Sequence, residues 1–474
     1  MLPFLPSFWF AQVVVAPPPA IESDYITQLQ EIRPLPGKLN DVPVFNSNSP
    51  EVVMGDGILL STFPPQGKSS PKAHLNKAFQ GRFDFFSHHI ARPQDSRQLH
   101  QGVILTNPTS RYITVRVLQG ASYLTSPDAP FVDLPSQVED PYGRIFSGPG
   151  SRLTNALLRG QSQPGLPRQI TIPPQETRLL FSLPISRSNA RSTYLRLESD
   201  GPVYMANLAL QDLWVLPSPD PLKPEEKLPP PTLRPPTLTD WQALLVRGHL
   251  ASPRDKVPTP PEQIQISSAT RPIYGRVAGI SLGTEWRTTV VDNKPGAKFL
   301  SIPQRGQSFS YPLSTVTVGT HGTRQIQSAP MVARYPDTAY LAHGNYGVHY
   351  QITLPLRNTT SNRQSVSLAM QTPLKQDQYG DRLFFVSRPR GQVFFRGTVK
   401  VSYADEQGQT QNRYFHLTQR QGQMAAPLLT LNLQPGEQRQ VSLDFLYPPD
   451  ATPPQVITIK TEELYYGNVL RQAN

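Results

Sequence analysis

Residues 103–111 read VILTNPTSR, and residues 352–362 read ITLPLRNTTSN. Each stretch is an apolar run that meets an Asn-containing polar turn, and apolar residues alternate with polar ones after the turn in both copies. Alternation at every second residue places one face of a strand on a core, and Asn, Pro, Thr and Ser favour the reversal. Both stretches therefore predict strand, turn and strand.

The two copies also end alike. Residues 170–178 read ITIPPQETR and residues 431–439 read LNLQPGEQR, each leading into another apolar strand. Two unrelated hairpins could look the same, and the spacing inside the copies differs, so both a duplication and a coincidence stay open.

The pattern predicts a mainly β chain of two immunoglobulin-like or related β-sandwich domains. The 53 prolines among 474 residues are about twice the average usage of ~5 %, which indicates long proline-rich loops and few short helices. The expected divisions are a signal segment (1–20), an extended proline-punctuated segment that supplies edge strands (21–82), sandwich 1 (83–215), a proline-rich linker with a short helix (216–262) and sandwich 2 (263–474).

Short helices are expected after residues 147–151 (SGPGS) and over residues 239–246. A glycine-containing helix start could hold an anion, but the lysine and Ser/Thr of a phosphate loop are missing. Residues 217–236 predict a polyproline spacer between the sandwiches. Strands near 273–280, 286–291 and 309–318 form either a small middle sheet or part of sandwich 2.

Composition limits the chemistry. The chain has no cysteine, which excludes disulfides, thiolate metal sites and cysteine nucleophiles. The net charge is +11, but Arg and Lys occur singly rather than in runs, so anionic polysaccharide or a membrane surface is a better expected partner than nucleic acid. The apolar start of the chain resembles a secretory signal without its basic residues, and a folded N-terminal strand is the alternative.

Several segments resemble an uncharacterised family of exported cyanobacterial proteins. They are residues 42–51, 123–131 (YLTSPDAPF), 334–340 (RYPDTAY), 342–347 (AHGNYG), 393–399 (VFFRGTV) and 445–456. The resemblance implies export and supplies no catalytic residue.

Two histidine clusters are candidate sites, at residues 84–89 (DFFSHH) and 343–349 (HGNYGVH). Asp84 and His88 would share one face of a strand, with His89 on the other, which is too few ligands for a metal site. The second cluster lies among tyrosines and could form a sugar-binding platform, because aromatic rings cover sugar faces while polar groups bind hydroxyls; a glycine-rich loop pinned by buried tyrosines is the alternative. The candidate ligand-binding residues are Arg334, Asp337, Tyr340, His343, Asn345, Tyr346 and His349.

We therefore expect a non-enzymatic, exported scaffold or binding protein of the periplasm or cell surface, without metal, cofactor or transmembrane span. Its expected partner is an anionic glycan or another envelope protein. The alternative is a carbohydrate-active enzyme that uses a carboxylate pair in the loops, such as Asp128 with Asp133 or Glu139 with Asp140. The separation between such carboxyls decides that mechanism, and the sequence does not give it.

Overall fold

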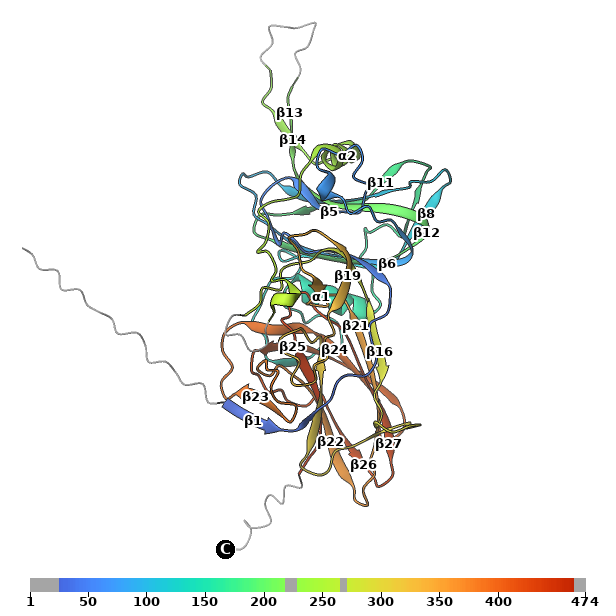
Figure 1. The fold of residues 1–474 in the computed structure, drawn as a ribbon, viewed down its shortest axis with the longest axis vertical. Coiled ribbons are helices and arrows are strands. Elements are labelled where there is room, and N and C mark those ends of the chain that lie inside the picture. Colours follow the sequence, from blue (N-terminus) through green and yellow to red (C-terminus); the bar gives the residue numbers. More distant parts are fainter. Residues whose placement is uncertain (1–24, 218–227, 265–270, 464–474) are drawn as a thin grey trace, which may run out of the picture.

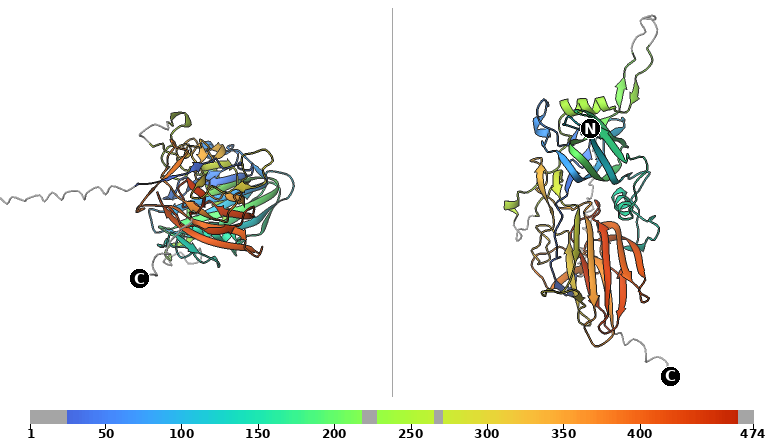
Figure 2. Two further views of the ribbon diagram at one scale, coloured as in Figure 1. Left: turned by 90° about the horizontal axis from the view of Figure 1, so that it is seen from below. Right: turned by 90° about the vertical axis from the view of Figure 1, so that its right-hand side faces the viewer.

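The computed structural model describes residues 25–217, 228–264 and 271–463. These residues form a mainly β structure with two α-helices, arranged as two halves stacked along the longest axis (Figures 1 and 2). The expectation of a mainly β chain is confirmed. The signal segment expected at 1–20 lies outside the described residues.

The upper half in Figure 1 is one twelve-stranded sheet folded over on itself. The long strand β12 belongs to both layers of this sheet, because its first part pairs with β6 and β8 and its second part pairs with β5 and β7. The pairing register shifts between Ser199 and Val203, where β12 passes from one layer to the other. The two layers enclose a core in which Phe85 and Leu195 of one layer cluster with Val103 and Met205 of the other. The strands are β3 (Pro43–Ser47), β4 (Val52–Val53), β5 (Gly57–Ser61), β6 (Phe79–Ala91), β7 (Leu99–Thr106), β8 (Ile113–Leu124), β10 (Gln169–Ile172), β11 (Thr177–Ile185), β12 (Ala190–Gln211), β15 (Ala278–Leu282), β19 (Ala329–Arg334) and β20 (Leu341–Ala342).

The lower half contains two sheets that face each other. Their shared core takes Ile352 and Leu354 from one sheet and Leu368 and Ile457 from the other. The seven-stranded sheet comprises β9 (Gln137–Glu139), β16 (Glu285–Thr289), β17 (Leu300–Ser301), β21 (His349–Arg357), β24 (Val393–Ala404), β25 (Thr410–Arg420) and β27 (Gln438–Leu446). The five-stranded sheet comprises β2 (Glu31–Ile32), β18 (Ser308–Leu313), β22 (Gln364–Gln371), β26 (Leu429–Leu433) and β28 (Gln455–Thr461). A separate pair joins β1 (Tyr25–Leu29) to β23 (Arg382–Val386).

The sequence repeat corresponds to a structural repeat. In the upper half β7 pairs with β11 and β8 pairs with β10, and in the lower half β21 pairs with β27 and β22 pairs with β26 in the same relative register. One Asn sits at each corner. Asn107 Nδ2 donates to the carbonyls of Arg111 (2.6 Å) and Ile172 (3.0 Å).

The second corner repeats these bonds. Asn358 Nδ2 donates to the carbonyls of Asn362 (2.8 Å) and Leu433 (3.0 Å), and its Oδ1 accepts from the Thr360 backbone N–H (3.0 Å). One buried amide thus holds two consecutive turns together.

Replacing Asn358 by Ala should lower the free energy of unfolding by about 1–3 kcal/mol, because the substitution removes the buried hydrogen bond to the Leu433 carbonyl and the bonds that hold the turn. Urea unfolding followed by tryptophan fluorescence measures the change. Thr359→Ala is the control, since Thr359 is exposed in the same turn. Equal stability of the two variants would contradict the role assigned to this amide.

Both expected helices are present. α1 (Pro149–Leu158) follows the predicted glycine turn, and α2 (Leu238–Arg247) is capped by Thr237 with Asp240 at the third helical position. α1 lies at the junction of the halves, where Leu153 and Leu157 cluster with Val44 of the upper half and Leu446 of the lower. The remaining helical turns are η1 (Pro71–Ala73) and η2 (Pro261–Gln263).

Three expectations about connections need correction. Of the expected edge strands, β2 does lie at the edge of the five-stranded sheet, but β3 lies between β6 and β15. β15 joins this large sheet rather than a middle sheet or the lower half, whereas β16 and β18 do belong to the lower half. The described ends of the proline-rich segment form a hairpin of β13 (Leu213–Val215) with β14 (Thr232–Arg234), and these two strands project from the upper half as an arm (Figure 1). The chain then returns to the same half, where α2 packs on the upper core, so these strands do not act as a spacer between two halves.

Candidate functional site

A cavity of about 180 Å³ lies where the two halves meet. It is formed by six separate segments of the chain, which explains why no single motif marks it. The space is far larger than the ~10–15 Å³ that one water requires, yet smaller than the ~300–1,000 Å³ of sites for drug-sized ligands. Its walls are formed by Asn46, Asn48, Tyr274, Gly275, Arg276, Val277, Val316, Ala342, His343, Gly344, Asn345, Tyr346, Lys375, Ala451, Thr452 and Pro453.

Two asparagines from the upper half line one side. Asn46 is at the end of β3 and Asn48 follows it, and only 5 % and 4 % of their surfaces are exposed. The Oδ1 atoms of both are buried without a hydrogen-bond partner among the described residues. Buried amides are normally bonded, so two such side chains on one small cavity indicate groups able to bind a ligand.

Aromatic side chains form a second wall. The rings of Tyr274 and His343 lie 4.4 Å apart, and the hydroxyl of Tyr274 accepts from the Val318 N–H at 2.9 Å. Tyr346 donates to the Ala451 carbonyl at 3.1 Å. Burial raises the pKa of Tyr346 to about 12 and lowers the pKa of His343 to about 4, so both side chains are neutral near pH 7.

Two cations reach the cavity, and no Asp or Glu does among its described walls. Arg276 forms an ion pair with Glu51. Lys375, which follows β22, has no carboxylate within ion-pair distance among the described residues. Burial, with a smaller contribution from Arg271, lowers the pKa of Lys375 to about 8.

Three of the seven residues predicted from sequence line this cavity: His343, Asn345 and Tyr346. Asn345 is already fully engaged. Its Nδ2 donates to the Gln327 carbonyl (2.8 Å) and the Tyr350 hydroxyl (3.1 Å), and its Oδ1 accepts from the Ala329 N–H (3.0 Å). Asn345 therefore shapes the loop rather than offering free polar atoms.

The other four lie elsewhere and are committed to partners within the fold. The two carboxylate oxygens of Asp337 accept from Arg254 at 2.7 and 3.1 Å. Arg334 donates to the Thr338 carbonyl at 2.6 Å and its guanidinium lies 3.8 Å from the ring centre of Tyr340. His349 lies 3.7 Å from Asp444. The platform predicted from residues 334–349 is therefore not assembled as one surface.

The sequence reading missed Asn46, Asn48 and Lys375. A usable signal existed for the first two, since residues 46–48 (NSN) directly follow the apolar strand 42–45. Nothing in the sequence placed Lys375 beside them, because its segment lies more than 300 residues later.

The first histidine cluster is structural. Asp84 accepts from the Tyr194 hydroxyl at 2.6 Å and pairs with Arg82 at 2.9 Å. His88 bonds the Ser192 hydroxyl at 2.8 Å, and His89 bonds the Pro50 carbonyl at 2.8 Å. Both rings are buried. Within the part of the chain that the structure describes, no three His, Asp or Glu side chains are placed to hold a metal.

The proposed carboxylate pairs serve the fold. Asp128 accepts from the Leu124 N–H at 2.8 Å, and Glu139 makes two bonds to Arg413 at 2.8 and 2.9 Å. Asp140 is buried and accepts from the Arg144 N–H at 2.9 Å. None of these carboxylates is a wall of the cavity.

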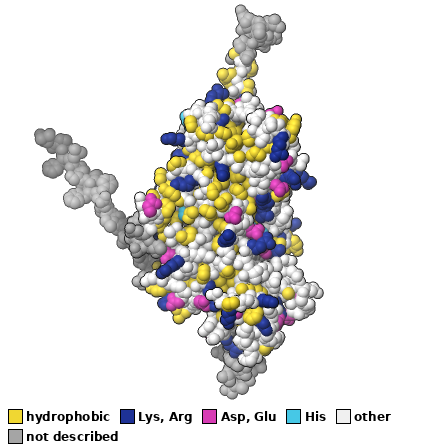
Figure 3. All heavy atoms as spheres, turned by 45° about the vertical axis from the view of Figure 1, so that its right-hand side comes forward, with side chains coloured by type: hydrophobic (Ala, Val, Ile, Leu, Met, Phe, Trp, Pro, Cys, Tyr) yellow, Lys and Arg dark blue, Asp and Glu magenta, His cyan; other side chains and the backbone are white. Residues whose placement is uncertain are grey.

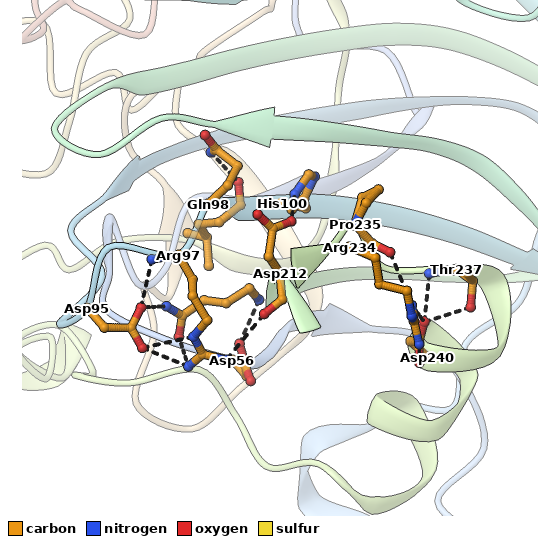
Figure 4. A network of polar contacts seen from close by, with 12 residues as sticks. Asp56, Asp95, Arg97, Gln98, His100, Asp212, Arg234, Pro235, Thr237 and Asp240 are labelled. Atoms are coloured by element: carbon orange, nitrogen blue, oxygen red, sulfur yellow. Dashed lines mark hydrogen bonds and ion pairs between the residues drawn. The ribbon is translucent and has the colours of Figure 1, made fainter. Parts of the chain in front are cut away.

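Charges at the base of the projecting arm pair with each other (Figure 4). His100 lies 2.7 Å from Asp212, and Arg97 donates to Asp95 at 2.9 Å. The Arg234 guanidinium 2.6 Å from Asp240 holds the pKa of that carboxyl well below its usual range. On the face seen in Figure 3, Lys and Arg are scattered among apolar and acidic side chains and do not form a stripe.

The chain belongs to the family described as "Protein of unknown function (DUF3370)", whose model matches residues 30–461. The search of curated proteins finds no match. Among solved structures, Lac15 from a marine microbial metagenome has 10 % identity and a TM-score of 0.10, with 82 % of this chain and 56 % of that chain covered. A Paenibacillus xanthan lyase has 8 % identity and a TM-score of 0.12, with 81 % and 23 % covered.

The chain thus spans about half of the first of these structures and about a quarter of the second. Similarities at these TM-scores carry no argument about fold or function. Among the described helices, none combines the length and apolar character needed to cross a bilayer.

Proposed function

We propose, for this member of a family of unknown function, that the chain is a non-enzymatic binding or scaffold protein whose ligand is a sugar unit of a glycan held in the junction cavity. The observation that carries the proposal is the pair of buried asparagines, Asn46 and Asn48, whose Oδ1 atoms lack partners among the described residues and which line the cavity together with aromatic side chains. A sugar supplies both of the complements that this arrangement needs.

The first complement is polar. A hydroxyl donates and accepts, so a ring that carries several hydroxyls can satisfy either atom of each amide. The second is apolar. The C–H face of a sugar ring packs on aromatic side chains, and Tyr274, His343 and Tyr346 supply them here. Because burial keeps His343 neutral, a sugar ring can pack on this wall without covering a charged imidazolium.

The alternative, a carbohydrate-active enzyme, receives less support from this cavity. Glycoside hydrolysis ordinarily requires two carboxyls on either side of the scissile bond, ~5–10 Å apart. The described walls contain no Asp or Glu, and Asp128, Glu139 and Asp140 are engaged in holding loops and strands. A binding role fits these side chains better.

Export to the periplasm or cell surface is part of the proposal, as is an origin among cyanobacteria. Both rest on the sequence resemblance and the apolar first residues. Mass spectrometry of the mature N-terminus after cell fractionation tests export. A cytosolic protein with residues 1–16 intact would overturn it.

We further propose that the two halves are sandwich domains of the immunoglobulin-like class. Support comes from the matching corners at Asn107 and Asn358 and from the layers that face each other across each core. The halves also exchange segments, since β9 of the first half of the sequence pairs with β25. The divisions near residues 83, 216 and 263 therefore divide the sequence, but they do not coincide with the boundaries of the two folded halves.

The function is tested by titrating the full chain with glucose, galactose and glucuronate by NMR or calorimetry. We expect binding near 1 mM for a single sugar unit (about −4 kcal/mol). Asn46→Ala and Asn48→Ala should each weaken it about tenfold, which corresponds to ~1.4 kcal/mol. Asn293→Ala, at an exposed turn, is the matched control. Failure of all three sugars to bind folded protein, or unchanged binding in both cavity variants, would refute the proposal.

A further inference from the structure

We propose that the junction cavity selects an acidic sugar, a hydroxylated ring bearing a carboxylate, and that Lys375 is the residue that recognises the carboxylate. This inference rests on the proposed function and adds to it the charge of the ligand. It follows from the charges that face the cavity, from the surroundings of Lys375 and from the size of the space.

The two cations at the cavity differ in how they are neutralised. The Arg276 guanidinium is paired with Glu51, which comes from the chain itself. Lys375 has no such partner among the described residues, and no described wall residue is acidic. The cavity therefore holds one cation without a counterion from the described part of the fold, and a ligand carboxylate would complete the pair.

The surroundings of Lys375 favour this pairing. Its ammonium lies 5.8 Å from the ring centre of Phe394, and a Cβ on Gly319 would lie 3.4 Å from its Cδ, so its stem runs along a packed surface. The nearby carboxylate of Asp377 is engaged by the backbone N–H groups of Gly319 and Thr320 at 2.6–3.0 Å. A partly buried charge is stabilised more by a direct ion pair than an exposed charge is. Charge-assisted hydrogen bonds are also roughly twice as strong as those between neutral groups.

The other walls supply what the rest of the ring requires. Asn46 and Asn48 line the cavity, and their Oδ1 atoms, which lack partners among the described residues, are suited to accept from hydroxyls, while Tyr274 and Tyr346 are aromatic walls. A space of about 180 Å³ accommodates roughly one ring rather than a chain of several. The ligand is therefore either a free sugar acid or the terminal acidic unit of a polysaccharide.

The test compares glucuronate with glucose, two rings that differ in the carboxylate. For the full-length chain we expect glucuronate to bind at least tenfold more tightly. Lys375→Met keeps the stem and removes the charge, and it should abolish this difference. Lys298→Met, at an exposed position, should leave the preference unchanged. A linear trigalacturonate then distinguishes the sources: binding tighter than that of galacturonate indicates a polymer end, and equal or weaker binding indicates a free sugar acid.

The outcomes distinguish the choice of an acidic ligand from the glycan-binding function itself. Equal affinity for glucose and glucuronate, or a preference that survives Lys375→Met, refutes the acidic ligand while the glycan-binding function stands. No binding of either sugar to folded protein refutes the function itself. If Lys375→Met does not fold, Lys375→Gln takes its place, since its side chain remains polar and is of similar length.

Discussion

Replacing Gly347 by Ala should destabilise the chain by about 3 kcal/mol or more, through a clash between the two halves. Gly347 has φ +84°, a region that L side chains rarely adopt, and a Cβ there would lie 2.1 Å from Cε2 of Tyr194. The left-handed conformation costs about 1–2 kcal/mol and overpacking a further ~1–3 kcal/mol.

The clash cannot be relieved by moving the ring. Tyr194 is buried on β12, and its hydroxyl donates to Asp84 Oδ2 at 2.6 Å. A displaced ring would break this bond and leave a buried carboxylate oxygen without a donor, which carries its own cost of ~1–3 kcal/mol. Gly347 belongs to the segment that enters β21, so the contact fixes the lower half against the upper one.

The matched control is Gly436→Ala. Gly436 also has positive φ, +76°, but a Cβ there meets no atom within 4 Å. Chemical denaturation of both variants separates the cost of the backbone conformation from that of the clash. We expect Gly436→Ala to lose only the first, about 1 kcal/mol. Equal losses would show that the junction yields to the added methyl group.

The sequence predicted those features of the fold that are local. The strands around Asn107 and Asn358 were predictable because each alternation, turn residue and corner lies within a dozen residues. The same applies to α2, whose capping residues Thr237 and Asp240 lie within one turn of each other and directly before the buried Trp241. Which strands become neighbours was not predictable, since β3 pairs with β15 across more than 230 residues.

The cavity was only partly predictable for the same reason. His343 and Tyr346 were recognised from a local cluster of aromatic and glycine residues, whereas Lys375 and Asn46 join it only after the halves pack. The helix start at 148–150 is a second example. The sequence leaves open that an anion binds there, and in the structure the carboxyl group of Asp450 lies at this helix start, since a Cβ on Gly150 would lie 2.6 Å from its Oδ2.

The stability of this protein should fall as the pH is lowered from 7 to 5, before most carboxylates are neutralised, because six of its nine histidines have a lowered pKa, five of them buried and His343 partly buried. Burial is the largest cause for each and sets their pKa at about 3 to 4, against 6.5 for a free ring. They are His74, His88, His89, His321, His343 and His416.

The sign follows from proton binding. Between pH 6.5 and about 4 the unfolded chain binds protons that the folded chain does not, so stability falls as pH falls through this window. A group shifted from 6.5 to about 4 contributes roughly 2 kcal/mol at pH 5. Four carboxyls act in the opposite direction, because burial raises their pKa and their ionisation on raising the pH disfavours the fold. They are Asp450, whose pKa is raised to about 6, and Glu51, Asp56 and Asp84. These carboxyls offset only part of the loss from six histidines, so we expect a net loss of at least ~3 kcal/mol from pH 7 to pH 5.

His416 isolates one contribution. It is fully buried on β25, and neither ring nitrogen has a hydrogen-bond partner among the described residues. His416→Leu should therefore change stability little at pH 8 and stabilise the protein by about 2 kcal/mol relative to wild type at pH 5. Urea unfolding at the two pH values measures this difference, with the exposed His249→Leu as the control. If the His416 and His249 variants keep the wild-type pH dependence, then burial of the His416 ring does not contribute to acid sensitivity, and another titrating group must account for it.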